Sequence, residues 1–66
     1  MTQVNRIREI RLNQGMTMKE LAQRAGISEA YLSDIERGNR NGKRQTLCRI
    51  ANGLGVMLSE LFEKAV

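Results

Sequence analysis

A chain of 66 residues, of which 41% are hydrophobic and 3% aromatic, can form one small domain with a core of Leu, Ile, Met and Val. One cysteine and no histidine exclude an intrachain disulfide and argue against a structural zinc site, and no apolar run approaches the ~20 residues of a membrane span. The net charge of +4 and the sequence pI of about 10.0 favour a polyanionic partner, usually nucleic acid, with an anionic membrane surface as the competitor.

The first predicted helix covers residues 2–14. Val4, Ile7 and Ile10 recur every three residues, which places a single apolar stripe along one helix face. Gly15 follows at the position where a left-handed glycine commonly ends a helix.

The second predicted helix, over residues 18–25, has the clearest start signal in the chain. Thr17 and Glu20 have the S/T-x-x-E spacing of a capping box, in which each side chain satisfies a backbone N–H at the helix start. Met16 and Leu21 occupy the positions of a hydrophobic staple across the same turn. The expected buried face consists of Leu21, Ala22 and Ala25.

A turn and a third helix follow directly. Gly26 can adopt a positive φ and reverse the chain sharply. Ser28 can then cap a helix that continues to about Arg37 and stops at Gly38. The apolar residues that would hold this helix to the second helix and the core are Ile27, Leu32 and Ile35.

The rest of the chain predicts a loop and two further helices. Residues 38–44 are polar, basic and flanked by glycine, which is typical of a surface loop. The fourth helix ends near Gly55, and Gly53 inside it weakens it by roughly 1 kcal/mol relative to alanine. Lys43 and Arg44 at its start oppose the helix dipole, so a frayed or late start is expected. The apolar residues of the fourth helix and of a short fifth helix are Leu47, Ile50, Ala51, Leu54, Leu58, Leu61 and Phe62.

These segments predict an all-α fold of five short helices in a single domain that covers residues 1–66. A domain of this size buries only roughly 60% of its unfolded surface, so its stability is marginal. The expected core consists of Val4, Ile7, Ile10, Leu21, Ala22, Ile27, Leu32, Ile35, Leu47, Ile50, Leu54, Leu61 and Phe62.

The chain resembles the phage repressor and Cro-type (XRE-like) helix-turn-helix family over nearly its whole length. The matching runs are Thr17-Met-Lys-Glu-Leu-Ala-Gln-Arg-Ala-Gly-Ile-Ser28 and Tyr31-Leu-Ser-Asp-Ile-Glu-Arg-Gly38, followed by Ile50-Ala51, Leu54-Gly55-Val56 and Leu61-Phe62. Short single-domain members look most similar, such as Cro-like proteins and the controller proteins of restriction–modification systems. The similarity to the controllers lies in the Tyr31 run together with Asn39-Arg40-Asn41.

This resemblance implies a lambda-repressor-like fold and a sequence-specific regulator of transcription. Such a protein binds a palindromic operator in double-stranded DNA as a homodimer, with its third helix in the major groove. The resemblance further implies a bacterial or phage-encoded protein that works in the cytoplasm.

The resemblance also implies roles for individual residues. Arg11 and Glu36 match an ion pair that joins the first helix to the third. The residues that match DNA-contacting positions are Thr17, Met18, Ser28, Glu29, Ala30, Tyr31, Ser33, Arg37, Asn39, Arg40, Asn41, Lys43 and Arg44. Physical chemistry supports a DNA-contacting role for the basic residues of this set, which can follow the phosphate backbone. It also supports such a role for Glu29, which can accept a hydrogen bond from cytosine N4. Asp34 would be repelled by phosphates without an obvious compensation.

Several of these residues also have purely structural interpretations. Ser28 is a helix cap first, and Glu29 could act only through the helix dipole. Tyr31 could pack half-buried, and the basic loop could be a solvated turn. Cys48 is interpreted as a small buried hydrophobe rather than a redox switch.

The last helix offers more apolar surface than so short a segment can hide. The expected homodimer interface consists of Met57, Leu58, Leu61, Phe62, Ala65 and Val66. The chain lacks a paired nucleophile and base, so no enzyme, cofactor, metal or small-molecule ligand is expected. The alternative function is a protein-interaction module or antitoxin-type adaptor, which the acidic residues on the third helix keep open.

Overall fold

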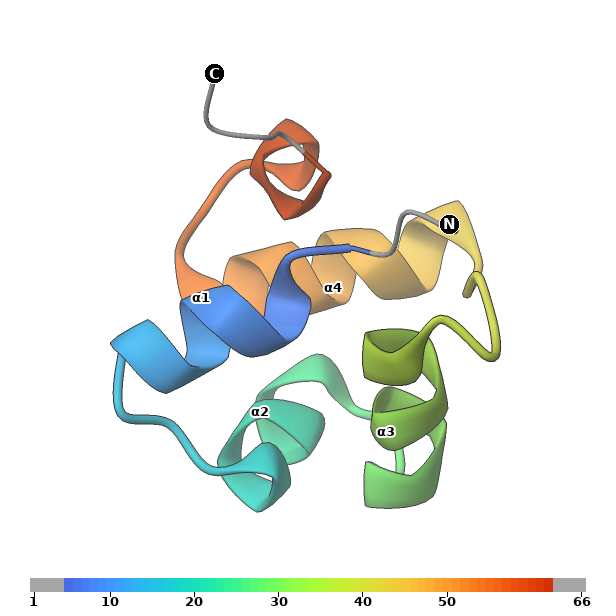
Figure 1. Cartoon of the computed structure of the whole chain (residues 1–66), viewed down its shortest axis with the longest axis horizontal. Helices are drawn as coiled ribbons and strands as arrows, with labels where there is room; N and C mark the ends of the chain where they lie inside the picture. Colours follow the sequence, from blue (N-terminus) through green and yellow to red (C-terminus); the bar gives the residue numbers. More distant parts are fainter. Residues whose placement is uncertain (1–4, 63–66) are drawn as a thin grey trace.

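The computed structural model describes residues 5–62 as four α-helices and one 3-10 helical turn (Figure 1). The elements in chain order are α1 (Ile7–Asn13), α2 (Met18–Ala25), α3 (Glu29–Arg37), α4 (Arg44–Leu54) and the turn η1 (Leu58–Leu61). These residues contain no strand, so the all-α prediction is confirmed. The predicted fifth helix is wrong, because its segment closes only a four-residue 3-10 turn.

The start of α1 differs from the prediction, which placed it at residue 2. Asn5 and Arg6 precede the helix. The side-chain oxygen of Asn5 accepts a hydrogen bond from the Ile7 N–H at 3.1 Å, while its amide nitrogen donates to the Ile35 carbonyl at 2.7 Å. An asparagine that bonds backbone two residues ahead favours a turn over a helix, which explains the later start. Val4 lies outside the described residues.

The boundaries predicted for α2 and α3 are confirmed. Both capping-box hydrogen bonds are present: the Glu20 N–H donates to Thr17 Oγ1 at 3.0 Å, and the Thr17 N–H donates to Glu20 Oε1 at 2.9 Å. Gly26 has a φ of 73°, in the left-handed region, and turns the chain from α2 towards α3. Ser28 Oγ accepts the Tyr31 N–H at 3.1 Å and caps α3.

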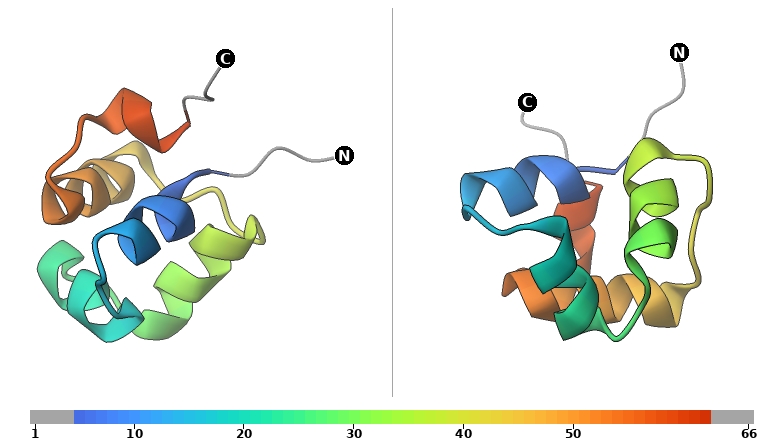
Figure 2. Two further views of the ribbon diagram at one scale, coloured as in Figure 1. Left: turned by 60° about the vertical axis from the view of Figure 1, so that its left-hand side comes forward. Right: turned by 90° about the horizontal axis from the view of Figure 1, so that it is seen from below.

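The helices surround one core, and α2 packs against both α4 and α3 (Figure 2). The core consists of Ile7, Ile10, Met16, Leu21, Ala22, Ala25, Leu32, Ile35, Ile50, Ala51, Leu54 and Leu61. Ile27 and Leu47, expected inside, are only partly buried against it, and Cys48, expected to be buried, is also only partly buried. The assignment of Phe62 to the core is wrong, because 47% of this residue is exposed where η1 ends.

Gly53 lies at a close contact between α4 and α2. A Cβ built on it would stand 3.1 Å from both Arg24 Cβ and Leu21 Cδ1. Arg24 Nη1 also donates to the Gly53 carbonyl at 3.2 Å, and Gln14 Nε2 donates to the Leu54 carbonyl at 2.7 Å. The glycine that weakens α4 as an isolated helix therefore permits its packing against α2.

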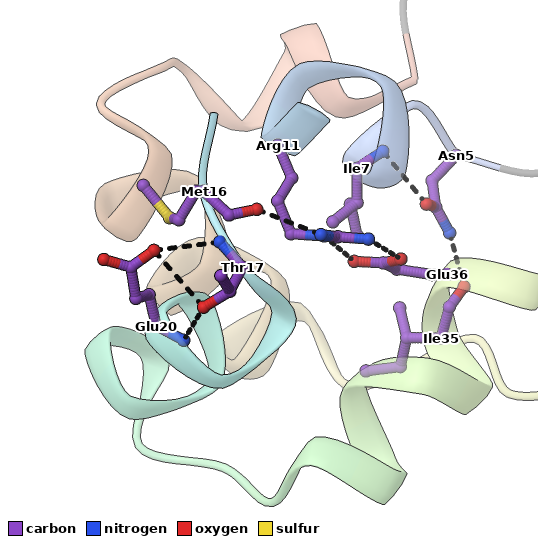
Figure 3. A network of polar contacts seen from close by, with 8 residues as sticks. All are labelled: Asn5, Ile7, Arg11, Met16, Thr17, Glu20, Ile35 and Glu36. Carbon is purple, nitrogen blue, oxygen red and sulfur yellow. Dashed lines mark hydrogen bonds and ion pairs between the residues drawn. The ribbon is translucent and has the colours of Figure 1, made fainter. Parts of the chain in front are cut away.

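A buried ion pair joins α1 to α3, as the family resemblance implied (Figure 3). Arg11 Nε lies 2.8 Å from Glu36 Oε2, and Arg11 Nη2 lies 3.1 Å from Glu36 Oε1. Arg11 Nη1 also donates to the Met16 carbonyl at 3.0 Å. Arg11 is 6% exposed and Glu36 is 7% exposed, so one guanidinium connects α1, the segment before α2, and α3 inside the protein.

Replacing Arg11 by Met is expected to lower the free energy of unfolding by about 3–5 kcal/mol, because it leaves the Glu36 carboxylate buried without its partner. The double variant Arg11→Met/Glu36→Leu should recover much of this loss, since no charge then remains buried. Urea denaturation followed by circular dichroism measures both values, with the exposed Arg49→Met as the matched control. A double variant as unstable as Arg11→Met would contradict the explanation by an unpaired charge.

The capping box also predicts a pH dependence of stability. The hydrogen bond from the Thr17 backbone N–H, followed by that from the Thr17 hydroxyl, lowers the pKa of Glu20 from its ordinary value of 4.5. A lowered folded-state pKa contributes stability that is present above the ordinary pKa and is lost as the pH falls through the folded-state pKa. Glu20→Gln keeps a capping side chain but does not titrate, so its melting temperature should approach that of the wild type as the pH falls below about 4.5. Parallel melting curves from neutral to acidic pH would argue against this contribution.

Candidate nucleic-acid interface

The first turn of α3 is presented to solvent on a fixed scaffold. Ser28, Glu29 and Ala30 are exposed, whereas Leu32 and Ile35 on the opposite side are completely buried. Because the buried side chains and the Ser28 cap fix the helix, its exposed face has a defined orientation. In Figure 1, α2 and α3 lie below α1 and α4.

The loop after α3 folds back onto this face. The backbone N–H groups of Asn39 and Arg40 donate to the Asp34 carbonyl at 2.9 and 3.3 Å. The Arg40 guanidinium lies with Nε 3.5 Å from Asp34 Oδ2 and with Cζ 5.6 Å from the centre of the Tyr31 ring. The Arg40 guanidinium offsets the negative charge of Asp34, for which the sequence had suggested no partner. An open hollow of about 420 Å³ lies beside these contacts. It is lined by Ser28, Ala30, Tyr31, Asp34 and Arg40.

A second hollow, of about 170 Å³, lies where α1, α2 and α3 meet. It is lined by Arg8, Met18, Ser33, Glu36 and Arg37. Met18, Ser33 and Arg37 belong to the predicted set, whereas Arg8 does not. The spacing between Arg8 and Arg11, three residues along one helix, was the signal that could have placed Arg8 beside α3.

The other predicted contact residues lie outside both hollows. Thr17, Glu29, Asn39, Asn41, Lys43 and Arg44 are all exposed. Lys43 is the N-terminal flanking residue of α4 and provides no side-chain cap, yet the helix begins at Arg44 without the expected delay. The backbone geometry at Lys43 and the packing of α4 on α2 therefore outweigh the unfavourable charge at the helix start.

The expected apolar interface is only partly available on the surface. Met57 is 69% exposed and Phe62 is 47% exposed, while Leu58 is half-buried. Leu61 is completely buried in the core and offers no surface to a second copy. Ala65 and Val66 lie outside the described residues.

Two further kinds of site can be assessed over residues 5–62. No group of three or more histidine, cysteine or acidic side chains is placed there to hold a metal ion. None of the helices in this part of the chain has the length and apolar character needed to cross a membrane.

Comparison with known proteins extends over most of the chain. Residues 7–61 match the helix-turn-helix family model. The HTH-type transcriptional regulator DdrOP3 of Deinococcus deserti is 41% identical over 58 residues, which cover 88% of this chain and 45% of that regulator. The chain thus spans less than half of that relative's length.

Two solved structures have the same fold. The restriction-modification controller protein C.AhdI from Aeromonas hydrophila superposes with a TM-score of 0.83 at 33% identity, over 86% of each chain. The master regulator for biofilm formation SinR, solved in complex with DNA, gives a TM-score of 0.80 at 36% identity over 88% of this chain and 94% of that one. The match over residues 7–61, together with the capped α2–α3 pair, shows that this chain belongs to the helix-turn-helix family.

Proposed function

We propose that this chain binds a palindromic operator as a homodimer and regulates transcription by placing α3 in the major groove. The observation that carries this proposal is the capped α2–turn–α3 unit, in which Ser28, Glu29 and Ala30 are exposed at the start of α3. A major groove about 12 Å wide admits one α-helix, so such a face can reach base edges. SinR, which has the same fold, was solved with DNA.

The roles divide between the first turn of α3 and the residues around it. Ser28, Glu29 and Ala30 face the bases, and Glu29 selects a base pair by accepting a hydrogen bond from cytosine N4. Tyr31 contacts the sugar-phosphate backbone beside them. The residues that bind phosphates or support the loop are Thr17, Met18, Ser33, Arg37, Asn39, Arg40, Asn41, Lys43 and Arg44. The net charge of +4 supports this assignment.

The proposed homodimer is based on the length of DNA that one domain can contact. A single α3 covers one face of one groove, so a specific site generally needs two copies about 34–36 Å apart. Met57 and Phe62, exposed on either side of η1, form the apolar surface that a second copy would cover.

The acidic side chains of α3 give less support to a protein-interaction module than to DNA binding. These residues kept this alternative open, but Glu36 is buried against Arg11 and Asp34 faces Arg40. Glu29 is left as the only α3 acid without such a partner in the described chain. One exposed acid in a first helical turn has an ordinary explanation in the helix dipole.

The test of the proposed function is a binding selection from random duplex DNA, followed by titration of the selected sequences at several salt concentrations. A palindromic consensus bound with a steep salt dependence is the expected result. Weak binding without a consensus would overturn the proposal. Repeating the selection with Glu29→Ala should relax the preference at one base pair.

The Asp34–Arg40 contact predicts opposite effects for two substitutions. Arg40→Ala should weaken binding about equally on all duplexes and reduce the slope of log K against log salt by about one unit. Asp34→Asn should strengthen binding to all duplexes, because it removes a negative charge from the interface and releases Arg40. Fluorescence anisotropy over a salt series measures both effects, with Arg49→Ala as the control for loss of one positive charge. An unchanged slope for Arg40→Ala would remove this residue from the phosphate-binding set.

The exposed apolar surface beside η1 predicts a variant that separates dimerisation from folding. Met57→Ser/Phe62→Ser should shift the sedimentation equilibrium towards monomer and weaken operator binding, because both side chains are exposed in one copy of the chain. The melting temperature at low protein concentration should change little. Leu12→Ser, which alters another exposed apolar residue, is the matched control. A wild-type protein that stays monomeric at high micromolar concentration, with and without operator, would contradict the homodimer.

A further inference from the structure

The smaller of the two hollows brings together basic side chains from two helices that are distant in sequence. Arg8 comes from α1 and Arg37 from the last turn of α3. Met18, the first residue of α2, and Ser33 complete its wall together with Glu36. Its volume of about 170 Å³ suits a small group rather than a large organic ligand.

The charge of this hollow is positive in spite of the carboxylate in its wall. Both oxygens of Glu36 are held by Arg11, at 2.8 and 3.1 Å, and this pair is buried. Arg8 and Arg37 are exposed, and neither forms an ion pair with an acid among residues 5–62. The guanidinium of Arg11 offsets the carboxylate of Glu36, which leaves two unpaired positive charges beside the Ser33 side chain.

The backbone gives these residues a fixed spacing. Ser33 and Arg37 are four residues apart on α3 and therefore share one face of that helix. Arg8 precedes Arg11 by three residues on α1, so the buried pair between Arg11 and Glu36 also holds the Arg8 turn against α3. A guanidinium group presents parallel N–H donors that match the oxygens of a phosphate.

We propose that Arg8 and Arg37 bind one phosphodiester group of the DNA backbone in this hollow, so that α1 takes part in the interface. This inference rests on the proposed DNA-binding function and adds to it a residue outside the helix-turn-helix unit. Arg8 contributes affinity on any sequence, because a phosphate contact carries no base information. It also fixes the angle at which α3 enters the groove, since α1 and α3 would be held against the same strand.

The experiment compares Arg8→Gln with wild type on a selected duplex and on a scrambled duplex over a salt series. Arg8→Gln should weaken binding to both by roughly tenfold at about 0.1 M salt and reduce the salt slope by about one unit. Arg8→Lys keeps the charge and should retain most of the slope. Arg49→Gln, which removes the same charge from the exposed surface of α4, should not reproduce the effect of Arg8→Gln. The melting temperature of each variant shows that the fold is intact.

The possible outcomes separate this inference from the proposed function. A wild-type protein that binds neither duplex in a salt-dependent way would overturn both. A wild-type protein with a steep slope that Arg8→Gln leaves unchanged would overturn only the role of Arg8. Titration with inorganic phosphate, followed through the Ser33 and Met18 amide signals by NMR, distinguishes a site for free phosphate from a site for the DNA backbone. If Arg8→Gln abolishes those shifts but leaves the DNA slope unchanged, the hollow binds free phosphate and the inference is wrong.

Discussion

The buried pair of Arg11 and Glu36 is the interaction on which the arrangement of the other elements depends. Among residues 5–62 the core has six completely buried large side chains, so apolar packing alone leaves the orientation of short helices weakly defined. A bidentate ion pair has a strict geometry, and the third guanidinium nitrogen of the same arginine donates to the Met16 carbonyl. Desolvation offsets much of the energy of such a pair, so its main effect is to fix how α1 and α3 meet. The exposed face of α3 takes its direction from this contact.

The ends of the helices are held by hydrogen bonds from other parts of the fold. Asn5 binds the carbonyl of Ile35 near the end of α3, and Gln14 binds the carbonyl of Leu54 at the end of α4. The backbone N–H of Arg6 donates to the Leu61 carbonyl at 2.6 Å and joins the start of α1 to η1. In helices of at most eleven residues the unsatisfied terminal groups are a large share of the backbone. Bonds between elements therefore replace the continuity that longer helices would provide.

The sequence predicted those features whose causes are local. The boundaries of α2 and α3 follow from Thr17, Glu20, Gly26 and Ser28, whose effects reach only a few residues. The predicted start of α1 was wrong because the Asn5 side chain bonds the Ile7 N–H two residues ahead and also the Ile35 carbonyl, thirty residues away, and the second contact exists only in the folded chain. The pairing of Asp34 with Arg40 depends on the path of a loop, and the approach of α2 to Gly53 depends on the packing of two helices. The candidate interface was predicted from the resemblance, which did not include Arg8, although the three-residue spacing between Arg8 and Arg11 could have placed Arg8 beside α3.

Under the proposed function, the cap of α3 has a consequence for how sequence specificity can change over evolution. Glu29 and Ala30 are exposed and contribute nothing to the core, so mutations there can alter the chemical character of the helix face at little risk to folding. Ser28 lies beside them on the same surface but also binds the Tyr31 N–H. Replacement by a residue that cannot cap would destabilise the helix by roughly 1 kcal/mol. If α3 reads DNA as proposed, new binding preferences can arise at two adjacent positions, while the third position is confined to the few residue types that can begin a helix.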